Sequence, residues 1–376
     1  MTTPHRVAIA HDWMVVEGGA ERVALELGRI LPDADVYTSF FDEATFGDRI
    51  DARRVRPWPL QLLFGPSHRF RSFLPFYPLY FGHLDLRSYD LVVSSSIAFT
   101  HAVRTRPGAV HVSYVYTPLR YAWDLDAYLE RSSFSVPARL GGRALRPWLR
   151  SWDRATAGRP DVVVGISRTV QDRIRRLWDR EAEVIYPPVD VDEITLSDRD
   201  EGYLLIAARM LAYRRLDLAV LAANRLQREL VMVGDGPERA RLEAMAGPTV
   251  RFVGRLARPA LVELIRGCHA YLVPGEEDFG IAPVEAMAAG KPVVAIAAGG
   301  AAETVIDGRT GVLFNEPTAG ALADAIKNVD SLALDRREIR ARAEVFGTGV
   351  FIEAWRSLFS RLGVDPSLYR HDAVIR

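Results

Sequence analysis

The strongest constraint on the fold of this chain is a repeated order of short apolar segment, glycine-containing loop and amphipathic segment. Near the N-terminus, Val7–Ala10 is predicted as a strand, Gly18 and Gly19 as a loop, and 20–31 as a helix. Further short apolar strands are predicted at 36–38, 91–94, 110–115 and 162–165. Strands that alternate with helices favour a parallel α/β sheet with ligands at the carboxyl ends of its strands.

The same order starts again near residue 203, so the chain is predicted to contain two domains. The stretch 187–200 contains two prolines and a polar, acidic run, which is typical of a linker. We expect an N-terminal domain (1–186), this linker, a C-terminal domain (201–350), and a helix or tail (351–376) that packs back on the N-terminal domain. The predicted fold class is α/β, with two Rossmann-like doubly wound domains facing each other across a ligand cleft.

Composition excludes several other classes. An apolar content of 49% and a charged content of 26% are ordinary for a soluble globular protein. The net charge of zero gives no reason to expect nucleic acid as a partner. The single cysteine, Cys268, excludes an internal disulfide and is predicted to be a buried thiol in a reducing cytoplasm. We expect a cytoplasmic location because no signal peptide or run of membrane-spanning length is recognisable.

The segment 276–300 carries the clearest chemistry. Pro283 is predicted at the first position of a short helix that ends at Gly290, which places Glu285 in its first turn and Glu277 in the preceding loop. Free N–H groups at a helix start attract an anion, and Gly280 lets a ligand approach the backbone. Carboxylates accept hydrogen bonds from sugar hydroxyls. Together these features indicate a site for a sugar nucleotide.

Several motifs resemble one family. They are "ARMLAYRRLD", "LVMVGDGPERARLEAMA", "PGEEDFGIAPVEAMAAGKPVVA" and "GGAAETVIDGRTGVLF", with "HDWMVVEGGAERV" and "YVYTPLRYAWD" in the N-terminal half. They resemble the retaining glycosyltransferases of family 4, which have the GT-B fold, in a bacterial branch that assembles polysaccharides of the cell envelope and includes mannosyltransferases. The resemblance spans most of the chain.

The resemblance implies three residues with catalytic roles. Arg209 and Arg214 match the positions that bind the donor diphosphate, and Glu277 matches the carboxylate near the donor sugar. The family usually has lysine where this chain has Arg214, but arginine keeps the charge and adds a bidentate geometry. Glu277 is interpreted as positioning the sugar more than as a covalent nucleophile.

The resemblance also implies a set of donor-binding residues. Glu285 would hold the ribose hydroxyls, Gly18 and Gly19 would face the diphosphate and the acceptor, and Arg258 would lie near the base. The backbone N–H groups beside sugar and phosphate would be those of Phe279, Gly280 and Ile281.

On the acceptor side the chain departs from the family. Tyr116 and Ile97 stand where relatives commonly have histidine. His101 and His11 are therefore candidates for an acceptor-side or catalytic role, together with Tyr116, although a structural role for His101 remains the alternative.

The resemblance implies a retaining, front-face transfer in which the departing phosphate takes the acceptor's proton. Neither a cofactor nor a metal is expected, since the triplets Asp124–Asp126 and Asp190–Asp192 are too short to be specific. The donor is a nucleoside diphosphate sugar, with GDP-mannose and UDP-sugars both open. An NAD oxidoreductase would need a different glycine spacing. The open alternative is a non-catalytic binder of nucleotide sugars with the same fold.

The stretch 52–84 suggests a partner. It contains five arginines, two histidines, many aromatic residues and no acid. This composition suits an anionic membrane surface that carries a lipid-linked acceptor. Peripheral association with the inner face of the plasma membrane and a saccharide or lipid-linked saccharide acceptor are the resulting expectations. The alternative is that the aromatic side chains form core and the arginines a solvated rim.

Overall fold

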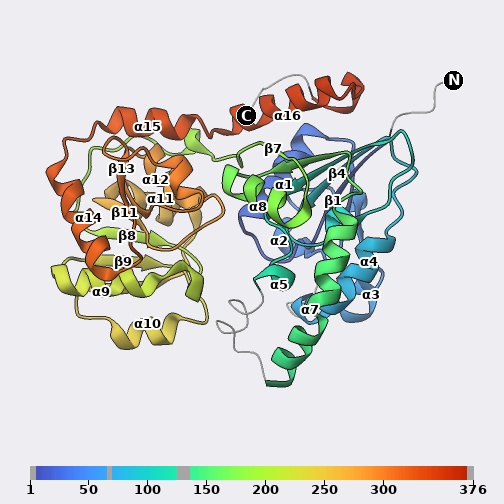
Figure 1. Ribbon diagram of the computed structural model, residues 1–376. Coiled ribbons are helices and arrows are strands. Elements are labelled where there is room, and N and C mark those ends of the chain that lie inside the picture. The colour runs from blue at the N-terminus through green and yellow to red at the C-terminus, as the bar shows by residue number, and fades with distance from the viewer. Residues whose placement is uncertain (1–5, 66–69, 125–135, 371–376) are drawn as a thin grey trace. The chain divides into compact units, whose positions relative to one another are not determined.

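The computed structural model describes residues 6–65, 70–124 and 136–370 of the chain. Within these residues, the contacts divide the chain into two compact units. The first unit contains the chain up to Asp124, the segment Val136–Tyr186 and the described residues from Phe351 onward, and the second unit is Pro187–Val350. Each unit contains one parallel β-sheet (Figure 1).

The sheet of the first unit has seven strands in the order β3-β2-β1-β4-β5-β6-β7, all paired in parallel. Its strands are β1 (Val7–His11), β2 (Asp35–Thr38), β3 (Val55–Pro57), β4 (Leu91–Ser96), β5 (Val110–Val115), β6 (Val162–Gly165) and β7 (Glu183–Val184). The strand order reverses direction between β1 and β4. In sheets of this kind, ligands bind at the carboxyl ends of the strands beside that switch point.

Helices of the first unit connect these strands. They are α1 (Gly19–Ile30), α2 (Glu43–Phe46), α3 (Gln61–Phe64), α4 (Tyr77–His83), α5 (Arg120–Trp123), α7 (Val136–Thr156) and α8 (Arg168–Trp178). The short 3-10 segments are η1 (Ala52–Arg54), η2 (Phe70–Phe76), η3 (Thr100–Ala102) and η6 (Pro366–Leu368). The helix predicted at 20–31 is thus present as α1, which begins and ends one residue earlier than predicted.

The last long helix, α16 (Thr348–Arg361), joins the core of the first unit from Phe351 onward. Trp355 is fully buried, and its ring lies 5.6 Å from that of Tyr114 and 5.3 Å from that of Phe359. Phe359 in turn contacts the ring of Tyr369 at 5.4 Å. These apolar rings explain why a segment so late in the chain packs on the strands of its first half.

The sheet of the second unit has six parallel strands in the order β10-β9-β8-β11-β12-β13. They are β8 (Leu204–Ala207), β9 (Leu230–Val233), β10 (Val250–Gly254), β11 (Ala270–Val273), β12 (Val293–Ile296) and β13 (Gly311–Phe314). The helices are α9 (Leu216–Leu226), α10 (Arg239–Met245), α11 (Arg258–Gly267), α12 (Ile281–Ala288), α13 (Ala301–Thr304), α14 (Ala319–Ser331) and α15 (Arg336–Glu344), with η4 (Val191–Glu193) and η5 (Ala212–Arg214).

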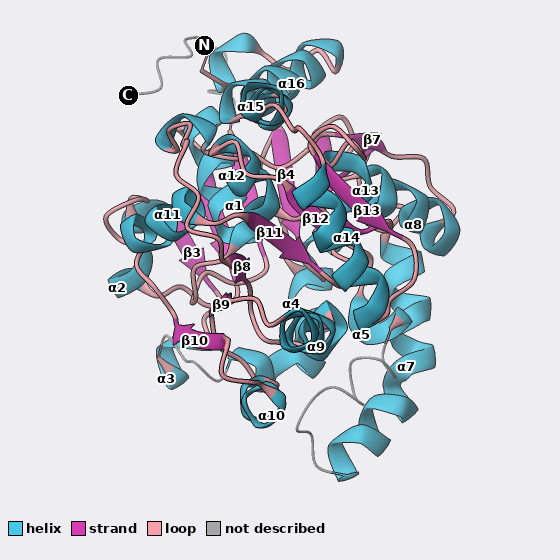
Figure 2. Cartoon of the chain, turned by 90° about the vertical axis from the view of Figure 1, so that its left-hand side faces the viewer, coloured by secondary structure: helices cyan, strands magenta, loops and turns pink. Residues whose placement is uncertain are grey.

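Both faces of this sheet are covered (Figure 2). Leu204, Leu272 and Val294 point to a core that includes Leu218 of α9 and Leu322 of α14. The strand residues that alternate with these, such as Val231 and Tyr271, are also buried, so the opposite face is not open to solvent. The doubly wound α/β fold predicted for both halves of the chain is therefore confirmed.

The stretch 187–200 differs from the polar linker that the sequence suggested, because it packs as part of the second unit. Val191 and Ile194 are buried despite their acidic neighbours. The guanidinium of Arg340 donates to the carbonyl oxygens of Ile194 (2.6 Å) and Ala288 (2.7 Å). These contacts fix the stretch against α12.

Candidate functional site

The loops that follow β8, β11 and β12 meet at the switch point of the second sheet, where β8 pairs with β11. The first loop contains Arg209 and Arg214, the second Glu277 and Gly280, and the third Gly299 and Gly300. Arg209, Arg214 and Glu277, which the resemblance assigned to the donor diphosphate and sugar, thus lie on neighbouring strand ends of the second unit. Gly18 and Gly19, also assigned to the diphosphate, belong to the first unit.

Arg214 lies directly beside Glu277. Its Nη1 donates to Oε1 of Glu277, and both side chains are largely buried. Burial lowers the pKa of Arg214, but the charge of Glu277 together with the nearby Tyr213 and Tyr271 raises the pKa above its ordinary value, so the guanidinium stays charged. Gly275 permits the approach, because a Cβ there would lie 2.5 Å from the backbone carbon of Arg214. The candidate phosphate ligand and the candidate sugar ligand therefore neutralise each other in this structure.

Helix α12 begins at Ile281, two residues before the start predicted from Pro283. Gly280 is the N-cap, with a left-handed φ of 91°, which glycine adopts without strain. Glu285 consequently lies in the second turn and not, as predicted, in the first. The helix starts earlier than predicted because the preceding loop ends at Gly280 and not at Pro283.

Glu285 is buried, and its Oε1 accepts a hydrogen bond of 2.5 Å from Nη1 of Arg258. Arg258 begins α11 and also lies 3.7 Å from Glu193. Two residues assigned separately to ribose and base thus form one ion pair. If the ribose hydroxyls of a nucleoside bind Glu285, they have to take the place of the Arg258 guanidinium on this carboxylate.

The glycines after β12 fix the loop that carries Glu277. Gly300 donates its N–H to the carbonyl oxygen of Glu277 at 2.8 Å. Phe279, which the loop buries, contacts the ring of Phe346 at 5.5 Å. A Cβ on Gly300 would lie 2.2 Å from Cα of Phe279, a distance that only a shift of the backbone could relieve.

Replacing Gly300 by alanine is therefore expected to displace the Glu277 loop and to weaken nucleotide-sugar binding by about tenfold or more, with a stability cost of about 1–3 kcal/mol. Calorimetric titration with a donor and urea unfolding would measure both effects. Gly349→Ala is the matched control, since a Cβ there meets nothing within 4 Å. Unchanged donor binding in Gly300→Ala would contradict this role of the loop.

Arg209 is exposed at the end of the β8 strand region. The neighbouring turn after β9 supports its backbone, because a Cβ on Gly234 would lie 2.1 Å from the carbonyl oxygen of Ala208 and one on Gly236 2.4 Å from that of Met210. Gly234 and Gly236 therefore allow this turn to pack closely against the backbone on either side of Arg209.

In the first unit, a chain of hydrogen bonds, which we call the Ser95 network, crosses the switch point between β1 and β4. Nδ1 of His11 lies 3.0 Å from Oγ of Ser95, which lies 3.0 Å from the hydroxyl of Tyr116. That hydroxyl donates to the carbonyl oxygen of Ala20 at 3.0 Å. The network therefore ties Tyr116 to the first turn of α1, directly after Gly18 and Gly19.

The tautomer of His11 follows from the hydroxyl hydrogens of Ser95 and Tyr116, each of which can be donated only once. If Tyr116 donates to Ala20, Ser95 must donate to Tyr116, and His11 must donate from Nδ1 to Ser95. Nε2 of His11 then carries a lone pair, is fully buried, and has no hydrogen-bond partner among the described residues. Burial lowers the pKa of His11 to about 4, so the ring is neutral near pH 7.

Each serine of the 94–96 triplet hydrogen-bonds to at least one side chain from outside β4. Besides the Ser95 network, Oγ of Ser94 lies 3.0 Å from Nε2 of His111, and Oγ of Ser96 lies 3.3 Å from Nδ1 of His101. Sequence reasoning missed His111 and this pairing. The signal that could have found it was three consecutive serines inside an apolar strand, which need partners when buried.

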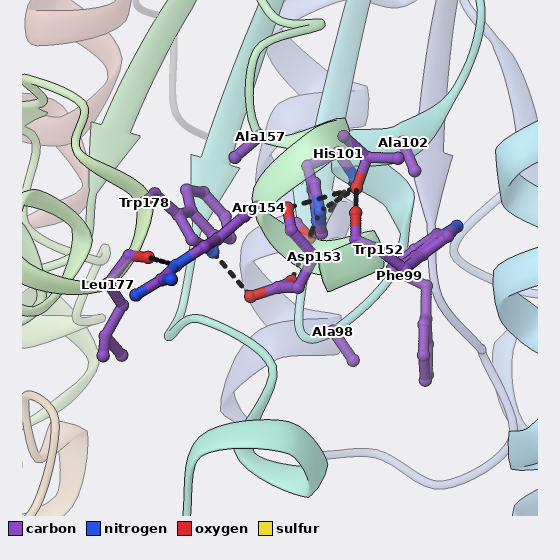
Figure 3. Close-up of polar contacts among 12 residues, drawn as sticks. Ala98, Phe99, His101, Ala102, Trp152, Asp153, Arg154, Ala157, Leu177 and Trp178 are labelled. Atoms are coloured by element: carbon purple, nitrogen blue, oxygen red, sulfur yellow. Dashed lines mark hydrogen bonds and ion pairs between the residues drawn. The ribbon is translucent and has the colours of Figure 1, made fainter. Parts of the chain in front are cut away.

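His101 lies in the interior of the first unit, beside Trp152 and Trp178 (Figure 3). Its Nε2 is 3.1 Å from Oγ1 of Thr156 and 3.5 Å from Asp153. Burial lowers its pKa to about 3. This environment supports the structural alternative and gives no access for an acceptor, so the candidate catalytic role of His101 is not supported by its position.

Asp153 is a buried carboxylate that the sequence did not single out. Its Oδ2 accepts from the indole N–H groups of Trp123 (2.7 Å) and Trp178 (2.6 Å), which joins α5, α7 and α8. Burial raises its pKa to about 6, against the opposing effect of the two indoles. Asp12 has a similar role, since its carboxylate accepts from the N–H groups of the 97–99 loop, and burial raises its pKa to about 6.

These groups predict how stability depends on pH. Unfolding between about pH 5.5 and pH 4.5 lets three histidines (11, 101 and 111), whose pKa values are lowered to about 4, 3 and 3, take up protons. Asp12 and Asp153, whose pKa values are raised to about 6, release protons on unfolding. Unfolding in this window therefore takes up about one proton in total. As a result, these groups lower the free energy of unfolding by about 1.4 kcal/mol for each unit by which the pH falls.

Replacing His111 by glutamine should therefore flatten the measured slope by about 1.4 kcal/mol per pH unit in this window. Urea unfolding at several pH values would measure it. His83→Gln is the control because this histidine is exposed, and an equal slope in the wild type and in His111→Gln would refute the assignment.

Comparison with solved structures defines the class of fold. Anabaena HepE, in its complex with UDP-glucose, is 18% identical and matches with a TM-score of 0.69 over 95% of this chain and 100% of that one. Sucrose-phosphate synthase from Thermosynechococcus elongatus is 18% identical, with a TM-score of 0.69 over 96% and 99% of the two chains. The fold is that of the two-domain α/β GT-B proteins.

Residues 17–193 match the family described as Glycosyltransferase Family 4, and residues 190–345 match the one described as Glycosyl transferases group 1. The chain belongs to these GT-B glycosyltransferases of family 4. This confirms the family suggested by the motifs.

The curated relatives with similar sequences are also named as glycosyltransferases. A D-inositol 3-phosphate glycosyltransferase of Mycolicibacterium smegmatis is 29% identical over 49% of this chain and 48% of its own length. An uncharacterized glycosyltransferase of Methanocaldococcus jannaschii is 26% identical over 44% of this chain and 48% of its own length. The matched segments thus span about half the length of these relatives.

Two features of the described residues concern metal binding and membrane insertion. No group of three or more His, Cys, Asp or Glu side chains in these ranges could hold a metal ion, and Asp126 of the first aspartate triplet lies outside them. Among the helices described, none is both long and apolar enough to span a membrane.

Proposed function

We propose that the chain transfers a hexosyl group from a nucleoside diphosphate sugar to a saccharide or lipid-linked acceptor, with retention of anomeric configuration. The observation that carries this proposal is the pairing of Arg214 with Glu277 beside the start of α12, at the switch point of the second sheet. A cation, a hydroxyl acceptor and free helix N–H groups at one place suit a diphosphate bonded to a sugar.

In this proposal, the donor rearranges the ion pair. The diphosphate takes the place of Glu277 on Arg214, and the freed carboxylate accepts hydrogen bonds from the sugar hydroxyls. Arg209 and Arg214 then stabilise the negative charge that develops on the departing diphosphate. That diphosphate takes the proton of the acceptor hydroxyl in a front-face step, which requires no metal or cofactor.

The proposal is tested by incubating the protein with UDP-glucose and GDP-mannose, with inositol 3-phosphate and a lipid-linked saccharide as acceptors. Release of nucleoside diphosphate and an α-linked product, followed by NMR, would support it. An inverted product would contradict retention. Tight donor binding without release or hydrolysis would favour the second candidate, a non-catalytic nucleotide-sugar binder, which the ion-paired state of Glu277 and Glu285 also permits.

We further propose a cytoplasmic location with peripheral attachment to an anionic membrane through the stretch 52–84. Large apolar side chains are exposed here at Leu62 (88%), Leu63 (77%), Phe64 (55%), Phe76 (54%) and Leu79 (56%). Other aromatic residues of the stretch, such as Tyr77 and Phe81, form core, as the alternative interpretation of its composition predicts for them. Residues 66–69 lie outside the described ranges.

The double substitution Leu62→Ser and Leu63→Ser is expected to weaken binding to phosphatidylglycerol-containing vesicles by about 100-fold or more, because each leucine loses about 1.5–3 kcal/mol of apolar burial. Vesicle co-sedimentation measures the effect. Leu221→Ser, an exposed leucine of the second unit, is the control. Binding that is equal in the double variant and the control would refute membrane attachment through this segment.

A further inference from the structure

A cluster of arginines lies at the amino ends of the strands of the first unit. Arg87 precedes β4, Arg104 precedes β5, and Arg159 precedes β6. Because the strands are parallel, their amino ends form the edge opposite to the one that holds the Ser95 network. The cluster is therefore separate from the candidate site of this unit.

Two of these guanidinium groups share one carbonyl oxygen. Nε of Arg104 donates to the oxygen of Gly82 at 2.9 Å, and Nη1 of Arg159 donates to the same oxygen at 3.0 Å. Arg159 also donates to the carbonyl oxygen of Ala102. No carboxylate of the described residues forms an ion pair with Arg104 or Arg159, although the charge of Asp85, which pairs with Arg87, also acts on Arg104.

The surface is hollowed at this place. A depression of about 360 Å³ is lined by Arg87, Val103, Arg104, Thr105 and Arg159. Arg87 also borders a second depression of about 480 Å³ with Asp85 and Ser88. In the first depression, which we call the arginine depression, the side chain of Arg87 is held by both carboxylate oxygens of Asp85, at 2.9 and 2.6 Å.

Electrostatics leave this depression short of negative charge. Burial, and then the charge of Arg104, lower the pKa of Arg159. Two guanidinium groups in this arrangement gain from an oxyanion, because their planar N–H donors match the oxygens of a phosphate, and the hydroxyl of Thr105 adds a donor.

We propose that the arginine depression binds a phosphate group, presented either by a soluble phosphate ester or by a lipid headgroup. Arg104 and Arg159 supply the charge-assisted hydrogen bonds, and Arg87, fixed by Asp85, closes one side. This site is independent of the donor site in the second unit.

The test is a titration with inorganic phosphate at constant ionic strength, followed by thermal unfolding, in the Arg209→Ala chain so that the donor diphosphate site is weakened. Saturable stabilisation is expected, and Arg104→Gln should lower the apparent affinity by about tenfold, the value of one lost charge-assisted bond. Arg87→Gln, which removes a largely exposed side chain held only by Asp85, provides a second variant if Arg104→Gln does not fold. The control is Arg29→Gln, whose side chain is 69% exposed and lies outside the stretch 52–84.

The outcomes separate the sources of phosphate. If Arg104→Gln weakens binding of both phosphate and phosphatidylglycerol vesicles, the ligand is a headgroup, whereas loss of phosphate binding alone indicates a soluble ester. The absence of saturable stabilisation, or equal phosphate affinity in the two depression variants and in Arg29→Gln, would overturn the proposal.

Discussion

Arg214→Ala is expected to reduce kcat/KM for glycosyl transfer by about 10²–10³-fold, the usual loss when one preorganised donor to a developing anion is removed. The guanidinium is charged and partly buried beside Glu277, so its electrostatic effect is less screened than that of a surface arginine. Most of the loss should appear in kcat, because the charge on the diphosphate grows in the transition state. Steady-state kinetics with a saturating acceptor measures it.

Arg214→Lys is the matched variant for this prediction. It keeps the positive charge, so we expect it to retain activity within about tenfold of the wild type. If alanine and lysine were equally damaging, the bidentate geometry of arginine and not its charge would matter. Full activity in Arg214→Ala would exclude the residue from catalysis.

Trp355→Ala is expected to destabilise the first unit by about 3–5 kcal/mol, since it removes a fully buried ring that contacts Tyr114, Phe351 and Phe359. Urea unfolding followed by circular dichroism measures the loss. Because the chain has two units, the unfolding curve should be fitted for two transitions, and the effect should fall on only one of them.

Trp355→Phe provides the control. The indole N–H of Trp355 has no hydrogen-bond partner among the described residues, so phenylalanine loses volume but no hydrogen bond. We expect a cost below about 1.5 kcal/mol. If Trp355→Ala were as mild as Trp355→Phe, the packing of α16 on the first unit would contribute little to stability.

Five of the seven strands of the first sheet could be predicted from sequence because they are short apolar runs, whereas β3 and β7 are too short and too polar to give this signal. Val110–Val115 and Val162–Gly165 have the predicted bounds, and the strand predicted at 91–94 extends to Ser96. The start of α12 could not be predicted from Pro283, because the left-handed conformation of Gly280 sets it.

The candidate site was predictable only as a set of residues, since motif spacing shows which loops contain them but not which side chains pair. The ion pairs Arg214–Glu277 and Arg258–Glu285 join residues 63 and 27 positions apart, and no local pattern indicates them. A structural role for His101 was foreseen as an alternative, but its partners Asp153 and Thr156 were equally hidden, because they come from a helix far along the chain.

The most direct test of the central claim is a thermal-shift titration with UDP and GDP on the wild type and on the variants Arg209→Ala and Glu285→Ala. At 100 times its dissociation constant, a ligand that binds only the folded chain stabilises it by about 2.7 kcal/mol. We predict that one nucleotide stabilises the wild type and that both variants lose most of this effect. Stabilisation that both variants retain in full, or no stabilisation of the wild type by either nucleotide, would contradict a donor site at the switch point of the second sheet.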